Sequence, residues 1–275
     1  MRRQQKKYYP TILGAIHLVV LYLFVQTVID FPLALIDYFN DTEYLYHPVK
    51  KIILGVGSVV FILYFGYRKA QTSIGELFPV RFFNPLVLIP ITLFLWASHN
   101  FLNDINIWVD KQIPPPPWFW ELFNKIFESD YGIYGAILKV VIIAPVIEEL
   151  IFRGIIMHGL MRNYPKLVAI FFSGLLFALF HLNPWQFPAT FLLGLLLGWI
   201  MIRTRNIFAC ILGHAINNGL VLLAITYADR ISEFSFSLMP KYDQLKISGL
   251  VAMLSLILIA LLTMNRKKKK QPAKN

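Results

Sequence analysis

Charged residues are scarce in this sequence of 275 residues. They make up 15% of the chain, whereas soluble proteins carry about a quarter. A soluble domain of this length needs a charged surface, so the composition excludes one. Because 57% of the residues are hydrophobic, intrinsic disorder is excluded as well. Cysteine is nearly absent, since Cys210 is the only one, and this excludes a disulfide-stabilised scaffold.

The few charges are unbalanced in sign. Lys and Arg number 26 against 15 Asp and Glu, which gives a formal net charge of +11. A basic chain often binds nucleic acid, but the apolar bulk of this one points to a membrane. We therefore expect no nucleic-acid partner, and the position of the cations becomes the informative feature.

Eight apolar runs approach the roughly 20 residues that cross a bilayer as a helix. They cover about 11–36, 52–67, 86–103, 132–161, 166–183, 187–202, 206–227 and 246–264, of which the second and sixth are short. These runs predict an all-α fold, a polytopic bundle of about eight transmembrane helices. The first run follows a basic start, but it is long and lacks a small-residue cleavage site. We interpret it as a retained helix rather than a signal peptide.

The cations are distributed asymmetrically between the loops of this topology. With the amino terminus inside, 17 of the 26 Lys and Arg residues fall on the inner side and 7 on the outer side. Cytoplasmic loops are enriched in Lys and Arg. We therefore predict a multi-pass protein of the bacterial plasma membrane, with both termini in the cytoplasm.

Three segments organise the chain. Residues 1–130 hold the first transmembrane helices and an interfacial segment, in which the aromatic run 118–123 favours the headgroup layer. Residues 131–228 form the core that carries the polar motifs. Residues 229–275 hold the last span and a basic tail, in which Arg266 to Lys270 predict contact with anionic lipid, as does the basic amino terminus.

Ionisable residues inside a bilayer are costly and therefore mark functional candidates. In the fourth run, Glu149 and Arg153 are four residues apart, with the acid first, which favours a helical ion pair. Glu148 points about 100° away and can face other partners as a general base. In the seventh run, His214 and Asn218 share one helix face, and both can donate hydrogen bonds to an oxyanion.

The fifth run adds His181, with Phe177 one turn earlier to shield its ring from lipid. At 1.5 Å per residue, Glu148 and His181 both lie roughly 21–22 Å from the cytoplasmic ends of their helices. His214 and Asn218 lie roughly 12 and 18 Å deep. Three helices thus bring these side chains into one layer of the membrane, which favours a reactive or ion-handling site over packing alone.

These residues form three ordered motifs, which are Glu148-Glu149-x-x-x-Arg153, Phe177-x-x-x-His181 and His214-x-x-x-Asn218. The set resembles the motifs of the CPBP intramembrane proteases, also called Abi. That family includes type II CAAX prenyl endopeptidases and bacteriocin self-immunity proteins. The resemblance covers roughly 132–227, and every motif position matches.

The resemblance implies an intramembrane endopeptidase that cuts a membrane-associated protein or peptide. By the same resemblance Glu148 activates water, which His181 helps to hold, and His214 and Asn218 stabilise the oxyanion. Glu149 and Arg153 fix the helix geometry or assist. A CAAX label is best read as ancestry, because many bacteria lack prenylated CAAX proteins.

The need for a metal is left open by the sequence. Glu148, His181 and His214 are the candidate ligands for a divalent ion such as zinc. The soluble zincin pattern His-Glu-x-x-His is absent, and a Glu-plus-His site also activates water without metal. Of the two alternatives, we favour catalysis without an obligatory metal.

Two other functions fit the same polar layer. A non-catalytic membrane protein of the bacteriocin-immunity type would bind a peptide without cutting it. An ion-coupled transporter would use the same side chains for flux, but the sequence lacks the internal repeats of many transporters.

Overall fold

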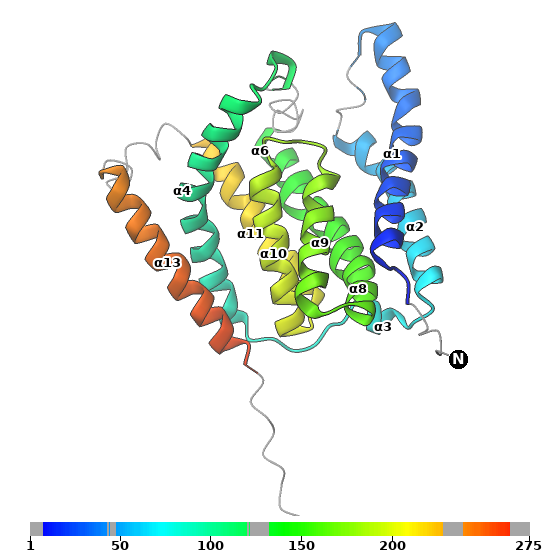
Figure 1. The fold of residues 1–275 in the computed structure, drawn as a ribbon. Helices are drawn as coiled ribbons and strands as arrows, with labels where there is room; N and C mark the ends of the chain where they lie inside the picture. Colours follow the sequence, from blue (N-terminus) through cyan, green and yellow to red (C-terminus); the bar gives the residue numbers. More distant parts are fainter. Residues whose placement is uncertain are drawn as a thin grey trace, which may run out of the picture.

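The computed structural model describes residues 8–42, 44, 48–119, 121, 132–227 and 239–264. Within these ranges the chain is a bundle of helices (Figure 1), and the β-bridge found there, between Val80 and Asn206, is isolated. The predicted all-α fold is therefore confirmed.

Seven long helices are regular. They are α1 (Ile12–Asn40), α2 (Pro48–Ala70), α4 (Leu88–Gln112), α9 (Lys166–Phe180), α10 (Phe187–Thr204), α11 (Ile207–Thr226) and α13 (Lys241–Leu262). Two short elements join α2 to α4, namely α3 (Ile74–Leu77) and the 3₁₀ turn η1 (Pro85–Val87). Each long helix coincides with one of the predicted spans.

The fourth predicted span is not a regular α-helix. It runs through five consecutive pieces: α6 (Gly132–Ala136), the π-helix η2 (Ile137–Ile143), α7 (Ala144–Glu149), the π-helix η3 (Leu150–Ile156) and α8 (Met157–Asn163). π-helical turns are rare and occur mostly at functional sites. Here they flank the six-residue segment that carries Glu148 and Glu149.

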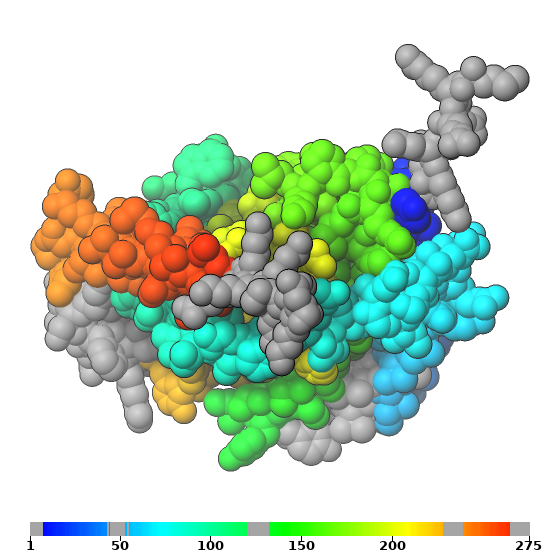
Figure 2. Space-filling model, turned by 90° about the horizontal axis from the view of Figure 1, so that it is seen from below, coloured from blue at the N-terminus to red at the C-terminus, as the bar shows by residue number. Residues whose placement is uncertain are grey.

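The irregular helix lies in the middle of the bundle. It packs with α9, α10 and α11, while α4 and α13 pack together on one side and α1 and α2 on the other (Figure 1). Figure 2, which views the bundle from below, likewise shows α13 at one edge, α2 at the opposite edge and the segment 132–227 between them. The start of α1 and the end of α13 lie at the same end of the bundle, as an even number of spans requires.

In the described part of the chain, five helices are long and apolar enough to cross a membrane, and α9 is a shorter apolar helix. The five are α1, α4 with its preceding turn, α10, α11 and α13. Many large apolar side chains of these helices are exposed, for example Phe24 and Leu13 of α1, as expected for surfaces that face lipid. The chain is therefore an integral membrane protein.

Close contact between α9 and α10 depends on two glycines. A Cβ atom at Gly194 would lie 2.7 Å from the Cα atom of Gly174, nearer than real side chains approach. Small residues at such crossings let helix backbones touch. This contact brings the α10 backbone towards the polar centre of the bundle.

Several predicted features lie outside the described residues. They are the basic amino terminus, half of the interfacial segment 118–123 and the basic tail 266–270. The three-segment division, the lipid contacts and the cytoplasmic orientation remain predictions.

Candidate active site

Glu149 and Arg153 form the predicted ion pair at the centre of the bundle. Arg153 Nη1 donates to Glu149 Oε1 at 2.9 Å, and neither side chain is exposed. Arg153 Nη2 also donates to the Gly194 carbonyl of α10, at 3.2 Å. A buried pair is tolerable only when further hydrogen bonds satisfy its charges. The second bond of Arg153 therefore ties the irregular helix to α10.

His214 shares the same carboxylate oxygen. Its Nδ1 lies 2.9 Å from Glu149 Oε1, and the imidazole is 3% exposed. Because Oε1 also receives Arg153, one oxygen binds two cationic or polar donors from two helices. A carboxylate on Nδ1 fixes the ring orientation and assigns the Nδ1 proton. His214 Nε2 therefore points away from Glu149.

Glu148 lies on the other side of His214. Its Oε2 is 4.0 Å from His214 Nε2, and its side chain is 15% exposed. Glu148 Oε2 is itself buried and has no hydrogen-bond partner among the described residues. The adjacent acids thus differ in surroundings. Two donors bind Oε1 of Glu149, whose Oε2 has no partner among the described residues, whereas the unbonded Oε2 of Glu148 faces an imidazole nitrogen.

Phe177 connects the three motifs. Its buried ring lies 5.5 Å from the His214 ring and 5.2 Å from the His181 ring, centroid to centroid. The Arg153 guanidinium sits over the same ring at 4.5 Å, a cation–π geometry. The predicted supporting residue is therefore in contact with the cation and with both histidines.

His181 ends α9 and is half-buried. Its Nδ1 lies 2.9 Å from the Phe177 carbonyl oxygen, which can only accept, so Nδ1 carries the proton. Nε2 is then an acceptor. This tautomer suits a residue that accepts a hydrogen bond from water.

Asn218 bonds to the backbone of the irregular helix. Its Nδ2 donates to the Val140 carbonyl at 2.8 Å, and its Oδ1 accepts from Asn217 Nδ2 at 3.1 Å. In η2 the Ala144 N–H donates five residues back, to Lys139. The next donor in that register is residue 145, which is a proline without an N–H. The Asn218 amide therefore donates the hydrogen bond to the Val140 carbonyl that Pro145 cannot donate.

The predicted metal ligands do not converge as a metal site requires. Among the described residues, no group of three or more His, Cys, Asp or Glu side chains is placed to hold a metal ion. Glu148 and His214 are neighbours, and the Phe177 ring lies beside both histidines. The donor set does not fit zinc as a His₂Glu ligand set would.

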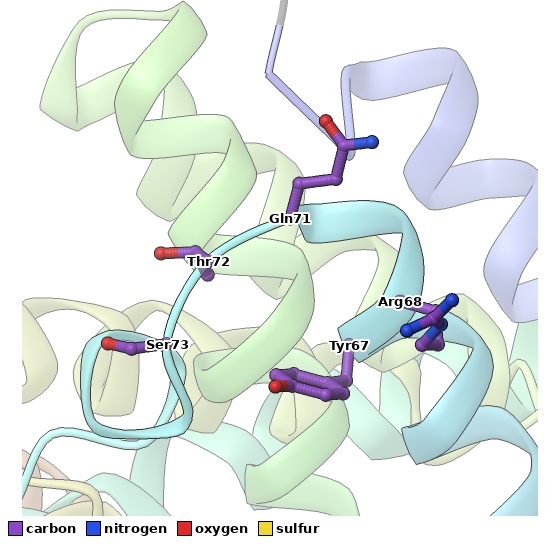
Figure 3. A pocket seen from close by; sticks show the side chains of 5 residues that line it. All are labelled: Tyr67, Arg68, Gln71, Thr72 and Ser73. Carbon is purple, nitrogen blue, oxygen red and sulfur yellow. The ribbon is translucent and has the colours of Figure 1, made fainter.

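An open pocket of about 490 Å³ lies elsewhere, at the end of α2, and is lined by Tyr67, Arg68, Gln71, Thr72 and Ser73 (Figure 3). Its side chains do not converge, since Arg68 and Ser73 lie on different sides of the chain. Nearby, a hydrogen bond from Thr72 lowers the pKa of Glu76. The Glu76 carboxylate therefore stays charged beside the Arg162 guanidinium, 4.0 Å away. This pocket is separate from the polar centre.

Two backbone carbonyl groups that take part in the candidate active site could not be predicted from the sequence pattern. The Gly194 and Val140 carbonyls bind Arg153 and Asn218, yet backbone groups are present at every residue. Tyr22 of α1 was also missed. Its ring stacks on the ring of Phe180, the residue before His181, with the centroids 5.3 Å apart and the ring planes at 9°.

The fold and the site together define a helical membrane protein with a buried Glu–Arg–His cluster. Residues 131–220 match the family model described as type II CAAX prenyl endopeptidase Rce1-like. The match covers all three motifs, so the resemblance to the CPBP and CAAX protease family is confirmed for this part of the chain. No curated protein and no solved structure matches the chain significantly.

Proposed function

We propose that this protein is an intramembrane endopeptidase that hydrolyses a peptide bond in a membrane-associated protein or peptide. The observation that carries the proposal is the pairing of Glu148 and His214 at 4.0 Å, with His214 oriented from behind by Glu149 at 2.9 Å. A carboxylate beside an oriented imidazole is an arrangement used for acid–base catalysis.

Glu148 is the general base in this proposal. Its free oxygen takes a proton from water, and the resulting hydroxide oxygen bonds to the peptide carbonyl carbon. His181 supports this step, because its Nε2 is available to accept the second hydrogen of the same water.

His214 stabilises the oxyanion. As the carbon–oxygen π bond opens, the electron pair moves to the carbonyl oxygen, and a protonated His214 presents Nε2–H to it. Preorganised donors aimed at such a developing charge contribute about 3–4 kcal/mol each. The carboxylate of Glu149 supports the positive imidazole, and Arg153 balances the charge of Glu149.

Asn218 has a divided role. One hydrogen of its amide is bound to the Val140 carbonyl, which leaves the other for the oxyanion.

When the tetrahedral intermediate collapses, the carbon–nitrogen bond breaks and the leaving nitrogen takes the proton from Glu148. This transfer regenerates Glu148 as the carboxylate. The products are an amine and a carboxylic acid, and the acid then loses its own proton to the amine or to solvent.

The test is cleavage by purified protein in detergent or liposomes. The probe is a quenched-fluorescence peptide that ends in a farnesylated cysteine and three further residues, with its unprenylated counterpart beside it. Glu148→Gln should abolish cleavage while the protein still folds. The matched control is Glu76→Gln, which alters an exposed acid and should cleave normally.

Wild-type cleavage by Glu148→Gln would refute the assignment. If neither peptide is cut, membrane peptides from cells with wild-type protein and with Glu148→Gln can be compared by mass spectrometry. A peptide that accumulates only in the variant identifies the substrate. An identical peptide set in both strains would contradict a peptidase and favour a protein that binds without cutting.

A further inference from the structure

The helix α1, which lies outside the family match, carries a polar face at bilayer depth. Tyr22, Gln26 and Asp30 are spaced by four residues, which places them on one face of the helix. At 1.5 Å per residue, Tyr22 is roughly 15 Å and Asp30 roughly 27 Å from the start of α1. The face therefore extends from the middle of the bilayer to the side where α1 ends.

Hydrogen bonds connect this face. Gln26 Nε2 donates to both carboxylate oxygens of Asp30 at 3.0 Å. Its Oε1 accepts from the Ser58 hydroxyl of α2 at 2.7 Å. Gln26 and Asp30 are both half-buried.

The inner end of the face reaches the candidate active site. Tyr22 stacks on Phe180, and Phe180 in turn lies 5.9 Å from the His181 ring. Among the described residues, the Tyr22 hydroxyl has no hydrogen-bond partner, so it is available to a small polar molecule.

The Ser58–Gln26 bond contributes to the packing of α1 against α2, and Asp30 lies one turn beyond Gln26 on the same face. A carboxylate within a transmembrane helix is costly and generally faces protein or water rather than lipid. Hydrolysis, for its part, consumes one water for each bond cut, and the hydrocarbon core supplies none.

We propose that the Tyr22–Gln26–Asp30 face of α1 is the path by which water reaches Glu148, entering from the side of the membrane where α1 ends. The proposal rests on the proposed function, because the water is the one that Glu148 activates. Tyr22 is a positioning residue at the inner end of the path.

Cysteine accessibility tests the path without any need for activity. Single cysteines replace Gln26 or Asp30 in a Cys210→Ala background, in which the native thiol, fully buried in the protein, is removed. Controls replace Phe24 or Val28, which lie at similar depth and are 64% and 54% exposed. The probe is a membrane-impermeant, cationic methanethiosulfonate added on the side where α1 ends.

We expect Gln26→Cys and Asp30→Cys to react at least about tenfold faster than the controls, because a cation is excluded from lipid but not from water. If Gln26→Cys does not fold, the labelling rate of Asp30→Cys alone tests the proposal, because that variant leaves the Gln26–Ser58 bond intact. Reaction at both positions no faster than at Phe24→Cys and Val28→Cys would overturn the proposal.

A kinetic measurement separates this path from the peptidase assignment. Gln26→Leu should lower kcat about tenfold at unchanged KM, whereas Thr27→Leu on a neighbouring face should not. Selective labelling at Gln26 and Asp30 in a protein without peptidase activity would support the water path and refute the proposed function. Cleavage without selective labelling would keep the function and refute the path.

Discussion

Arg153 Nη1 lies 2.9 Å from Glu149 Oε1, and neither side chain has exposed surface. Both charges therefore depend on each other and on the bonds of Arg153 to Gly194 and of Glu149 to His214. The pair acts as a framework that fixes α10 and α11 against the irregular helix. The two formal charges of the pair balance each other, and in the proposed function Glu148 and His214 are the groups that exchange protons with a substrate.

We expect Arg153→Met to lower the free energy of unfolding by about 3–5 kcal/mol, because it leaves a buried carboxylate uncompensated. The double variant Glu149→Gln, Arg153→Met should recover part of that loss, because both charges are then gone. Thermal unfolding in detergent measures the effect, and Arg162→Met, at a 38% exposed cation, is the control. A double variant less stable than Arg153→Met alone would contradict the mutual dependence.

Phe177→Leu tests whether the shared aromatic ring positions the two histidines. The substitution keeps an apolar side chain but removes the ring under Arg153, a contact estimated at about 0.5–2 kcal/mol. We expect a folded protein with a lowered kcat and nearly unchanged KM. The matched control is Phe171→Leu on the same helix, where the ring is 46% exposed. Equal kcat values for the two variants would show that Phe177 only fills space.

The helices and the ion pair could be predicted because they depend on local pattern. Apolar runs of about 20 residues produce membrane helices, and a four-residue spacing brings Glu149 to Arg153. Both features follow from helix geometry, which requires no knowledge of neighbouring segments.

The remaining contacts depend on how distant segments pack. Arg153 finds the Gly194 carbonyl because α9 and α10 meet at two glycines, and Asn218 finds Val140 because η2 is π-helical. Neither the π register nor a backbone acceptor is visible in the spacing of side chains. Asp30 of α1 is different, since an acid within a long apolar run was a visible signal that the motif-centred reading overlooked.

The donor arrangement predicts that activity does not depend on a bound metal. Among the described residues, Glu148, His181 and His214 do not form a group of three side chains placed to hold a metal ion. Purified protein treated with EDTA or phenanthroline should retain its cleavage rate and contain far less than one zinc per chain by elemental analysis. Loss of activity on chelation, restored by zinc, would contradict this prediction and the proposed mechanism.

Asn218 and Pro145 are coupled through the Val140 carbonyl. Asn218→Leu removes the donor at 2.8 Å and leaves a buried carbonyl unsatisfied, at a cost of about 1–3 kcal/mol. Pro145→Ala restores a backbone N–H at the position where the π register needs one. We therefore expect the double variant to be more stable than Asn218→Leu alone in thermal unfolding.

Activity should respond differently from stability in the same variants. If Asn218 also donates to the oxyanion, Pro145→Ala restores the fold of Asn218→Leu but not its kcat, because the backbone N–H bonds to Val140 and not to the substrate. Asn217→Leu, which removes only the donor to Asn218 Oδ1, is the control and should lose less kcat. Full recovery of kcat in the double variant would assign Asn218 to the helix backbone alone, whereas recovery of stability without kcat would place its second hydrogen at the reacting carbonyl.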